Sequence, residues 1–197
     1  MGSAPAYFTA LLKAAGYGVV GIDLDPSRIG DVVAMFELDI RRCDVEQDRR
    51  PFPDERFACV VFMEILEHLR IDPLFALAEV NQVLRPGGML ILTTPNFYSA
   101  QNVARFALGR GVGDALTEFR KLRLVGHMGH IREYTRAEVG RSLEYSGFAL
   151  RHHRFADYST PRAKRQTAKF LLARILPNCF LSFHEVVAEK VSAAPAR

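Results

Sequence analysis

Acidic side chains stand at two places where the sequence pattern predicts the end of a strand. Asp23 follows the apolar stretch "YGVVGI", and Asp44 follows "ELDIRRC". A carboxylate in the first place can accept hydrogen bonds from both hydroxyls of a ribose. In the second place, a carboxylate and the next backbone N–H, that of Val45, can bind the amino and ring nitrogens of adenine. The pair indicates a nucleoside site, and Gly2 precedes Asp23 by 21 positions, close to the roughly 20 expected between a glycine loop and such an acid.

A second group of reactive side chains follows the next apolar stretch, in "EILEHL" (64–69). Glu64 and His68 are four positions apart, so on a helical turn they share a face. A metal site would need a third ligand nearby in the sequence, and none is visible, so we expect no metal. The alternative is a first helical turn whose acids, Glu64 and Glu67, favour the positive end of the helix dipole.

A third group lies in "GHMGHIREYT" (126–135). His130 is the first candidate for a general base, because its unperturbed pKa lies near neutrality, and His68 is the second. Arg132 and Tyr134, together with Asn96 after the stretch "MLILTTP", are expected to bind a polar substrate. The alternatives are that His130 only orients its neighbours, and that Arg132 and Tyr134 only anchor the next helix.

Alternating strands and helices are expected to position these groups. The pattern predicts a parallel α/β sheet, in which ligands bind at the carboxyl ends of the strands. The stretch "FACVVFM" is continuously apolar, which is typical of a strand buried on both faces. The predicted strands are 16–23, 37–44, 57–63, 89–95, 147–155 and 183–191, and the predicted helices are 6–15, 25–35, 73–84, 99–108, 135–148 and 163–176.

Two of the predicted segments have functional interpretations of their own. Residues 97–130 are too long for an ordinary connection, and loops of that length are usually lids or binding loops. The helix 163–176 is basic and amphipathic. It is either a crossover helix packed on the sheet or a membrane-surface helix that presents a lipid-like substrate.

Composition limits the class of protein. The chain has 197 residues, of which 49% are hydrophobic and 24% charged, and a net charge of +4. These values are ordinary for one globular domain and do not argue for a nucleic-acid partner. The cysteines Cys43, Cys59 and Cys179 have neither metal-ligand nor redox spacing, which favours a reducing, cytoplasmic location. No apolar run reaches the roughly 18 residues of a membrane helix.

Four segments together resemble the class I S-adenosylmethionine-dependent methyltransferases, in their small bacterial form. These are "VVGIDLDPSR", "RCDVEQDRRPFPDERFACVVFMEILEHL", "VNQVLRPGGMLILTTPN" and "GHIREYTRAEVGRSLEYSGF". The resemblance implies a doubly wound, mostly parallel, Rossmann-like sheet of seven strands with an antiparallel C-terminal strand. It also implies S-adenosylmethionine as cofactor and a small-molecule, sugar or lipid-like methyl acceptor, with oxygen as the expected acceptor atom.

The resemblance assigns further residues and also shows departures. It places a glycine loop at "GSAPAYFTALL", where Gly2 is kept and Ala4 and Ala6 stand at the next two glycine positions. Glu64 is expected to face the cofactor. The family's first, central strand is missing, so we expect a single domain over 1–197 that lacks this strand and carries an acceptor-side insertion at 97–134.

Two alternatives follow from these departures. One is an inactive or cofactor-binding-only remnant of the fold, which the altered glycine loop favours. The other is a dinucleotide-dependent oxidoreductase, which shares the acid and the glycine loop but leaves "EILEHL" and "LRPGGMLILTTPN" unexplained.

Overall fold

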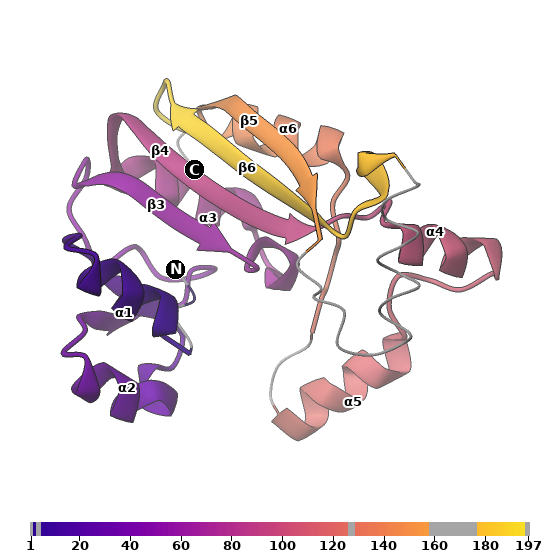
Figure 1. The fold of residues 1–197 in the computed structure, drawn as a ribbon, viewed down its shortest axis with the longest axis horizontal. Helices are drawn as coiled ribbons and strands as arrows, with labels where there is room; N and C mark the ends of the chain where they lie inside the picture. The colour runs from indigo at the N-terminus through magenta and orange to yellow at the C-terminus, as the bar shows by residue number, and fades with distance from the viewer. Residues whose placement is uncertain (1, 3–4, 126–128, 158–176, 196–197) are drawn as a thin grey trace.

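The computed structural model describes residues 2, 5–125, 129–157 and 177–195 (Figure 1). Helices and strands alternate along most of the chain, as the sequence predicts. In chain order the elements are α1 (Tyr7–Ala14), β1 (Gly21–Asp23), η1 (Pro26–Ile29), α2 (Gly30–Met35), β2 (Ile40–Arg42), β3 (Phe57–Met63), η2 (Leu66–His68), α3 (Pro73–Val83), β4 (Leu84–Pro95), α4 (Ala100–Ala107), α5 (Ala115–Val125), α6 (Arg136–Tyr145), β5 (Phe148–Ala156), η3 (Asn178–Phe180) and β6 (Phe183–Lys190).

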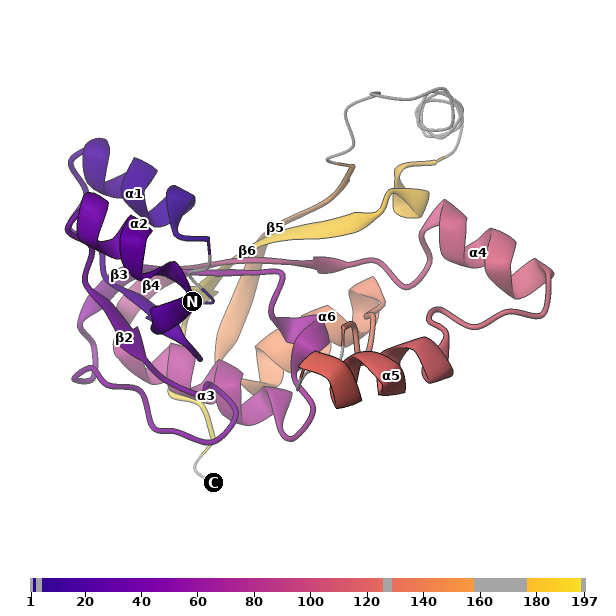
Figure 2. The same cartoon turned by 90° about the horizontal axis from the view of Figure 1, so that it is seen from below.

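The strands form a mainly parallel arrangement with one antiparallel strand. β1 pairs with β2 in parallel, and the second sheet has the order β3-β4-β6-β5. β3 and β4 are parallel, whereas β6 runs antiparallel to both β4 and β5. Figure 2 shows α3 and α6 on one side of the sheet and α1 and α2 toward the other. The predicted Rossmann-like fold with an antiparallel C-terminal strand is therefore confirmed.

The main core lies between the larger sheet and the helices α3 and α6. Phe62 of β3 and Leu90 and Leu92 of β4 are completely buried, and Leu77 of α3 is 1% exposed. Burying side chains of this size stabilises the fold by roughly 1.5–3 kcal/mol each. This layer fixes the carboxyl ends of β3 and β4 beside each other.

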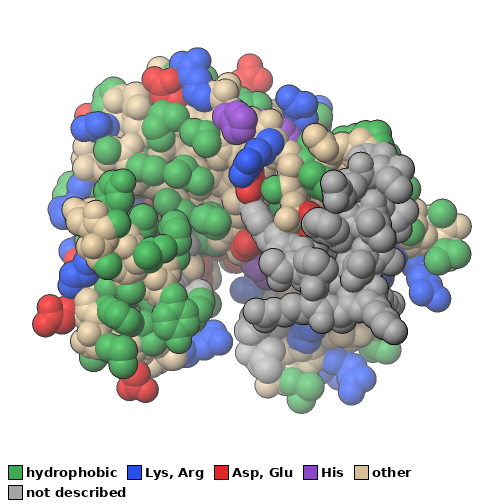
Figure 3. Space-filling model, in the orientation of Figure 1, with side chains coloured by type: hydrophobic (Ala, Val, Ile, Leu, Met, Phe, Trp, Pro, Cys, Tyr) green, Lys and Arg blue, Asp and Glu red, His purple; other side chains and the backbone are tan. Residues whose placement is uncertain are grey.

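The prediction that β3 is buried on both faces is wrong for the part of the chain that the structure describes. Val60 and Phe62 are buried, but Ala58, Cys59 and Met63 are exposed. Figure 3 shows hydrophobic side chains gathered on the face of the molecule over β3 and α1. The continuous apolar run therefore predicted the strand correctly but not its burial. Val60 and Phe62 pack into the core with α3, whereas Cys59 and Met63 stay exposed.

The start of β4 also differs from the prediction. The stretch "RPGG" (85–88) was expected to end a helix, but it belongs to the first part of β4, where the register with β3 shifts between Phe57 and Cys59. Gly87 has φ +71°, and a Cβ on Gly88 would lie 2.8 Å from the carbonyl oxygen of Arg85. These two glycines therefore permit a bulge inside the strand rather than a turn before it.

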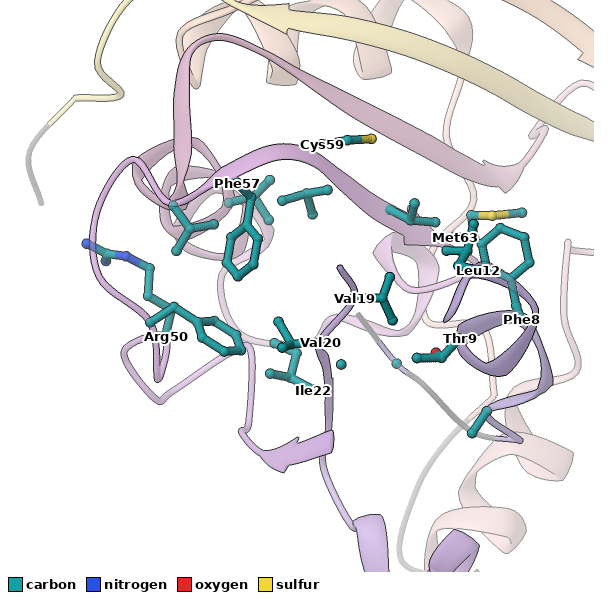
Figure 4. Close-up of a pocket in the computed structure, with 18 of the residues that line it drawn as sticks. Phe8, Thr9, Leu12, Val19, Val20, Ile22, Arg50, Phe57, Cys59 and Met63 are labelled. Carbon is teal, nitrogen blue, oxygen red and sulfur yellow. The ribbon is translucent and has the colours of Figure 1, made fainter. Parts of the chain in front are cut away.

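The two sheets do not pair with each other within the described residues. A cavity of about 580 Å³ separates β1 from β3, and residues from both ends of β3, Phe57 and Met63, line it. Figure 4 shows Val19, Val20 and Ile22 on one wall of this cavity and Phe57 on the other. The cavity therefore lies between β1 of the smaller sheet and β3 of the larger one.

Candidate functional site

The two predicted nucleoside ligands lie at neighbouring strand ends. β1 and β2 are in register from Gly21 with Ile40 to Asp23 with Arg42, and the N–H of Cys43 donates to the carbonyl of Asp23 at 2.9 Å. Asp44 therefore follows β2 directly beside the end of β1. Because parallel strands end at the same edge of a sheet, the structure brings both carboxylates to one edge.

Both carboxylates also organise their own loops. Asp23 Oδ1 accepts from the N–H of Asp25 at 3.1 Å. Asp44 Oδ1 accepts from the N–H of Glu46 at 3.0 Å, and its Oδ2 accepts from the amide of Gln47 at 2.9 Å. A carboxylate has about four lone-pair sites, so these bonds orient the group and leave it capacity to accept from a ligand.

A buried glutamate holds the second of these loops in place. Glu46 is 7% exposed, and its Oε1 accepts hydrogen bonds from the backbone of Arg70 and, at 2.6 Å, of Ile71. The loop after β2 is thereby tied to the segment that follows η2. Val45, whose N–H is the predicted adenine contact, lies between this anchor and Asp44.

The glycine loop is only partly described, because Ala4 lies outside the described residues. Gly2 has φ +63°, and a Cβ there would lie 2.9 Å from Cδ1 of Ile65. Ala6 also has a positive φ, 68°, just before α1, although it is not a glycine. The backbone thus keeps the conformation that glycine favours at both positions.

Glu64 leaves β3 in a conformation that is uncommon for a non-glycine residue, with φ 52°. Its N–H donates to the carbonyl of Thr93 at 3.0 Å, and its Oε1 accepts from the hydroxyl of Thr93 at 2.7 Å. Contacts to β4 therefore hold the residue at the carboxyl edge. Glu64 also lines the cavity between the two sheets, as does Gly2.

The two histidines predicted as bases lie together around a buried carboxylate. The ring centroids of His68 and His130 are 5.1 Å apart. Glu67 is completely buried beside them, and its Oε2 accepts from the hydroxyl of Thr94 at 3.0 Å. Burial raises the pKa of Glu67 to about 7. The Glu133 carboxylate, 3.5 Å from Nδ1 of His130, raises the pKa of that histidine.

The predicted substrate ligands have different surroundings. Asn96 is 1% exposed, and its amide nitrogen donates to the carbonyls of Cys179 and Leu181, each at 2.8 Å. Tyr134 is buried, whereas Arg132 is exposed and pairs with Glu138 at the start of α6. Asn96 thus anchors the loop before β6, so we leave it out of the acceptor site that we propose.

Sequence reasoning missed a pair of histidines that supports this region. The Nε2 of His184 donates to the carbonyl of Tyr134 at 2.8 Å, and its Nδ1 accepts from Nε2 of His153 at 2.9 Å. Burial lowers the pKa of His153 to about 4 and also lowers the pKa of His184. Both histidines belong to strands with no recognisable motif, so only their pairing across β5 and β6 shows the role.

A cavity of about 840 Å³ lies beside His130, on the side of α4 and α5. Aromatic rings and carboxylates line it, among them Phe97, Tyr98, Phe119, Glu118 and Glu133. The predicted insertion 97–134 contributes most of these walls and includes α5, a helix that the sequence analysis did not predict. Figure 1 shows the arrow ends of β3 and β4 on the side of the molecule where α5 lies.

Comparisons with known proteins decide the family. A family model described as a methyltransferase domain matches residues 1–153. The chain belongs to the methyltransferase domain family. A probable S-adenosylmethionine-dependent methyltransferase of Mycolicibacterium smegmatis is 30% identical over 150 residues, which is 76% of this chain. The match covers 50% of that relative, so the chain spans about half of its length.

Solved structures agree with this methyltransferase assignment at the level of the fold. An S-adenosylmethionine-dependent methyltransferase from Mesorhizobium loti has a TM-score of 0.66 and 23% identity, covering 95% of this chain and 88% of that one. A Burkholderia thailandensis 1,6-didemethyltoxoflavin-N1-methyltransferase, solved with S-adenosylhomocysteine, has a TM-score of 0.60 and 17% identity, covering 97% and 69%. The predicted class I methyltransferase family and its cofactor, S-adenosylmethionine, are confirmed, and the oxidoreductase alternative is set aside.

The basic segment 163–176, interpreted as a crossover or membrane-surface helix, lies outside the described residues. Among the residues that the structure describes, no helix combines the length and the apolar composition needed to cross a bilayer.

Proposed function

We propose that this chain transfers the methyl group of S-adenosylmethionine to a small-molecule acceptor. The observation that carries the proposal is the placement of Asp23 and Asp44 at the ends of two paired parallel strands, within a methyltransferase domain. Two adjacent carboxylates at this edge suit the ribose hydroxyls and the adenine of one nucleoside.

The residues present fit this cofactor. Asp23 would accept from the ribose hydroxyls, and Asp44 with the N–H of Val45 would bind the adenine. Gly2, where a Cβ would lie 2.9 Å from Cδ1 of Ile65, lines the cavity with Glu64 and is the residue proposed to lie beside the methionine part. When bound, S-adenosylmethionine supplies an electrophilic methyl group on a positively charged sulfur.

The acceptor is proposed to enter the cavity beside His130. Aromatic walls from Phe97, Tyr98 and Phe119 favour an acceptor with an apolar or ring-shaped body. Of the small-molecule, sugar and lipid-like classes, this lining favours lipid-like acceptors and ring-shaped small molecules. Oxygen remains the proposed acceptor atom. Holding the acceptor atom in line with the methyl carbon would supply most of the catalysis.

His130 is the proposed proton acceptor, with His68 as the second candidate. The raised pKa of His130 means that a larger fraction of it is protonated at neutral pH than of a free histidine. A base role therefore requires a pH above that pKa. Arg132 pairs with Glu138 and lies over the ring of Tyr134 at 5.5 Å, so we assign Arg132 mainly to shaping the cavity wall and the buried Tyr134 to supporting it from behind.

A second candidate is a domain that binds the cofactor without turnover. The observation that favours it is Ala6, which occupies a left-handed conformation where the family resemblance places a glycine. The methyltransferase and the domain without turnover both require the nucleoside site, but only the methyltransferase requires an acceptor. Binding of S-adenosylmethionine must therefore be measured before methyl transfer.

Calorimetric titration with S-adenosylmethionine tests the site. The substitutions Asp23→Ala and Asp44→Ala should each weaken binding by about 1–3 kcal/mol, because each removes a hydrogen-bonded partner of the ligand. The control is Asp31→Ala, an exposed acid on α2 away from the strand ends, which should bind like the unaltered chain. Unchanged affinity in both strand-end variants would overturn the assignment.

A further inference from the structure

Three side chains at the carboxyl ends of β3 and β4 form a cluster with possible metal ligands. Glu67, His68 and His130 each offer one ligand atom, and these atoms all lie within 4.8 Å of one another. His130 is 62 positions after His68 in the chain, so the fold supplies the third ligand that the sequence around "EILEHL" lacks. The expectation of no metal rested on that lack.

The buried carboxylate of Glu67 is the observation that points to a ligand. Its residue is completely buried, and its Oε1 has no hydrogen-bond partner among the described residues. This oxygen lies 3.8 Å from Nε2 of His68, which is too long for a hydrogen bond. A buried carboxylate oxygen left without a partner is costly, and a cation between it and the imidazole would remove that cost.

The separations suit one small cation. Ligand bonds of about 2.0–2.2 Å in a tetrahedral site place neighbouring ligand atoms about 3.4 Å apart. The 3.8 Å between Glu67 and His68 is close to that value. The ligand atoms all lie within 4.8 Å of one another, so no pair would need to close by more than about 1.4 Å, and the half-exposed ring of His130 can rotate.

Neighbouring groups orient both imidazoles in the way that metal-binding histidines are usually oriented. Nδ1 of His68 lies 2.9 Å from the carbonyl oxygen of Gly129, so it carries the proton and the ring's lone pair is on Nε2. Nδ1 of His130 lies 3.5 Å from Oε1 of Glu133. A carbonyl or carboxylate behind a metal-binding imidazole fixes its tautomer and orientation. The Gly129 carbonyl and the Glu133 carboxylate therefore hold the two imidazoles in place.

We propose that Glu67, His68 and His130 bind one divalent transition-metal cation at the wall of the acceptor cavity. Two imidazoles and one carboxylate suit Zn²⁺, Mn²⁺, Fe²⁺ or Co²⁺ better than Mg²⁺ or Ca²⁺, which prefer oxygen ligands. Three protein ligands leave at least one coordination position open. Since His130 also lines the acceptor cavity, an oxygen of the acceptor would fill that position. In the metal-bound form the cation, which lowers the pKa of a bound oxygen group, would replace His130 as the group that activates the acceptor.

Metal titration of the full chain, after treatment with a chelator, tests this proposal. Zn²⁺ is followed by calorimetry, and Co²⁺ by its visible absorption, which reports the ligand geometry. We expect one equivalent bound, and at least tenfold weaker binding in Glu67→Gln, His68→Gln and His130→Gln. The control His152→Gln removes an exposed imidazole on β5 and should bind within twofold of the unaltered chain.

The outcomes separate clearly. Stoichiometric binding that all three substitutions weaken supports the site. Absence of binding to the unaltered chain at millimolar metal, or binding that none of the three substitutions changes, overturns it. If Glu67→Gln fails to fold, the half-exposed His130→Gln still decides. Affinity for S-adenosylhomocysteine, measured on the same samples without metal, should not change, so failure of the metal site is distinct from failure of the nucleoside site.

Discussion

Individual residues at the candidate site carry backbone strain. Glu64 has φ 52° and Ala6 has φ 68°, a conformation that costs a non-glycine residue roughly 1–2 kcal/mol. Glu64 is held by two contacts with Thr93, and the buried side of Ala6 packs into the small core that includes Ile29 and Leu38. Strain of this kind persists where the surroundings fix the backbone, which is common at ligand-binding loops.

At the residue scale, the His153–His184 pair should make stability depend on pH. Both folded-state pKa values are lowered, that of His153 from 6.5 to about 4. The unfolded chain therefore binds more protons than the folded one between these values, so stability present above pH 6.5 is lost as the pH falls toward 4. We expect a loss of roughly 1–2 kcal/mol, because part of His153 remains accessible to solvent.

Thermal melts between pH 7.5 and pH 5 measure this effect. The variant His153→Gln keeps a donor toward His184 and removes one titrating group, so its stability should fall less on acidification than that of the unaltered chain. The exposed His152→Gln is the matched control and should keep the original pH dependence. The same acid sensitivity in His153→Gln as in the unaltered chain would contradict the role of the pair.

At the scale of elements, the cap at the start of α6 fixes the position of the chain beside the proposed acceptor cavity. The hydroxyl of Thr135 accepts from the N–H of Glu138 at 3.2 Å, and the carboxylate of Glu138 accepts from the N–H of Thr135 at 2.8 Å. These two reciprocal hydrogen bonds form a capping box. It starts the helix directly after Tyr134, and so fixes where the chain leaves the cavity wall.

Loss of this cap should destabilise the domain measurably. Thr135→Ala removes one partner of the N-terminal N–H groups and should cost about 1 kcal/mol, or about 2–4 °C in melting temperature for a chain of this size. Arg141→Ala, an exposed substitution later in the same helix, is the comparison and should change stability by less than about 0.5 kcal/mol. Equal melting temperatures for the two variants would show that the capping box contributes nothing.

Elements with strong local signals could be predicted, and elements that depend on distant contacts could not. The apolar run predicted β3 at its observed residues, 57–63, and the sequence predicted α6 over 135–148, where the helix spans Arg136–Tyr145. α5 was missed because its apolar residues Leu116 and Phe119 remain 67% and 55% exposed. A helix that buries one face shows apolar residues at helical spacing, and the described residues of α5 have no such buried face.

The same distinction applies to the site. Asp23 and Asp44 could be paired in advance, because adjacent parallel strands end at one edge. The approach of His130 to Glu67 could not be foreseen. It depends on the N–H of Ile131 donating to the carbonyl of Glu67 at 2.7 Å and on the bridge between Asn96 and Tyr134. These contacts exist only once the chain has folded.

At the scale of the whole molecule, a cavity lies between β1 of the two-stranded sheet and β3, the edge strand of the larger sheet. Apolar side chains line most of it, and Gly2 lies at its wall. The length of β3 along the cavity, Phe57–Met63, is that of one ordinary strand. Strand edges beside an apolar cavity favour pairing with another chain.

An apolar strand of about seven residues supplied ahead of Met1 should therefore stabilise the domain and reduce self-association. Thermal melts and gel filtration of the extended and original chains measure both effects. The control extension has the same length but only Gly and Ser residues, which cannot fill an apolar cavity. An original chain as stable and as monomeric as the extended one would contradict this interpretation of the cavity.

The central claim is that one nucleoside binds at the shared edge formed by the ends of β1, β2 and β3. Hydrogen–deuterium exchange with and without saturating S-adenosylhomocysteine tests it most directly, because it locates binding without requiring an acceptor. We expect amide exchange to slow about tenfold or more in 21–25, 43–46 and 64–68, and to stay unchanged at 85–88, at the opposite end of β4. Protection confined to other segments, or no protection at a saturating ligand concentration, would contradict the account.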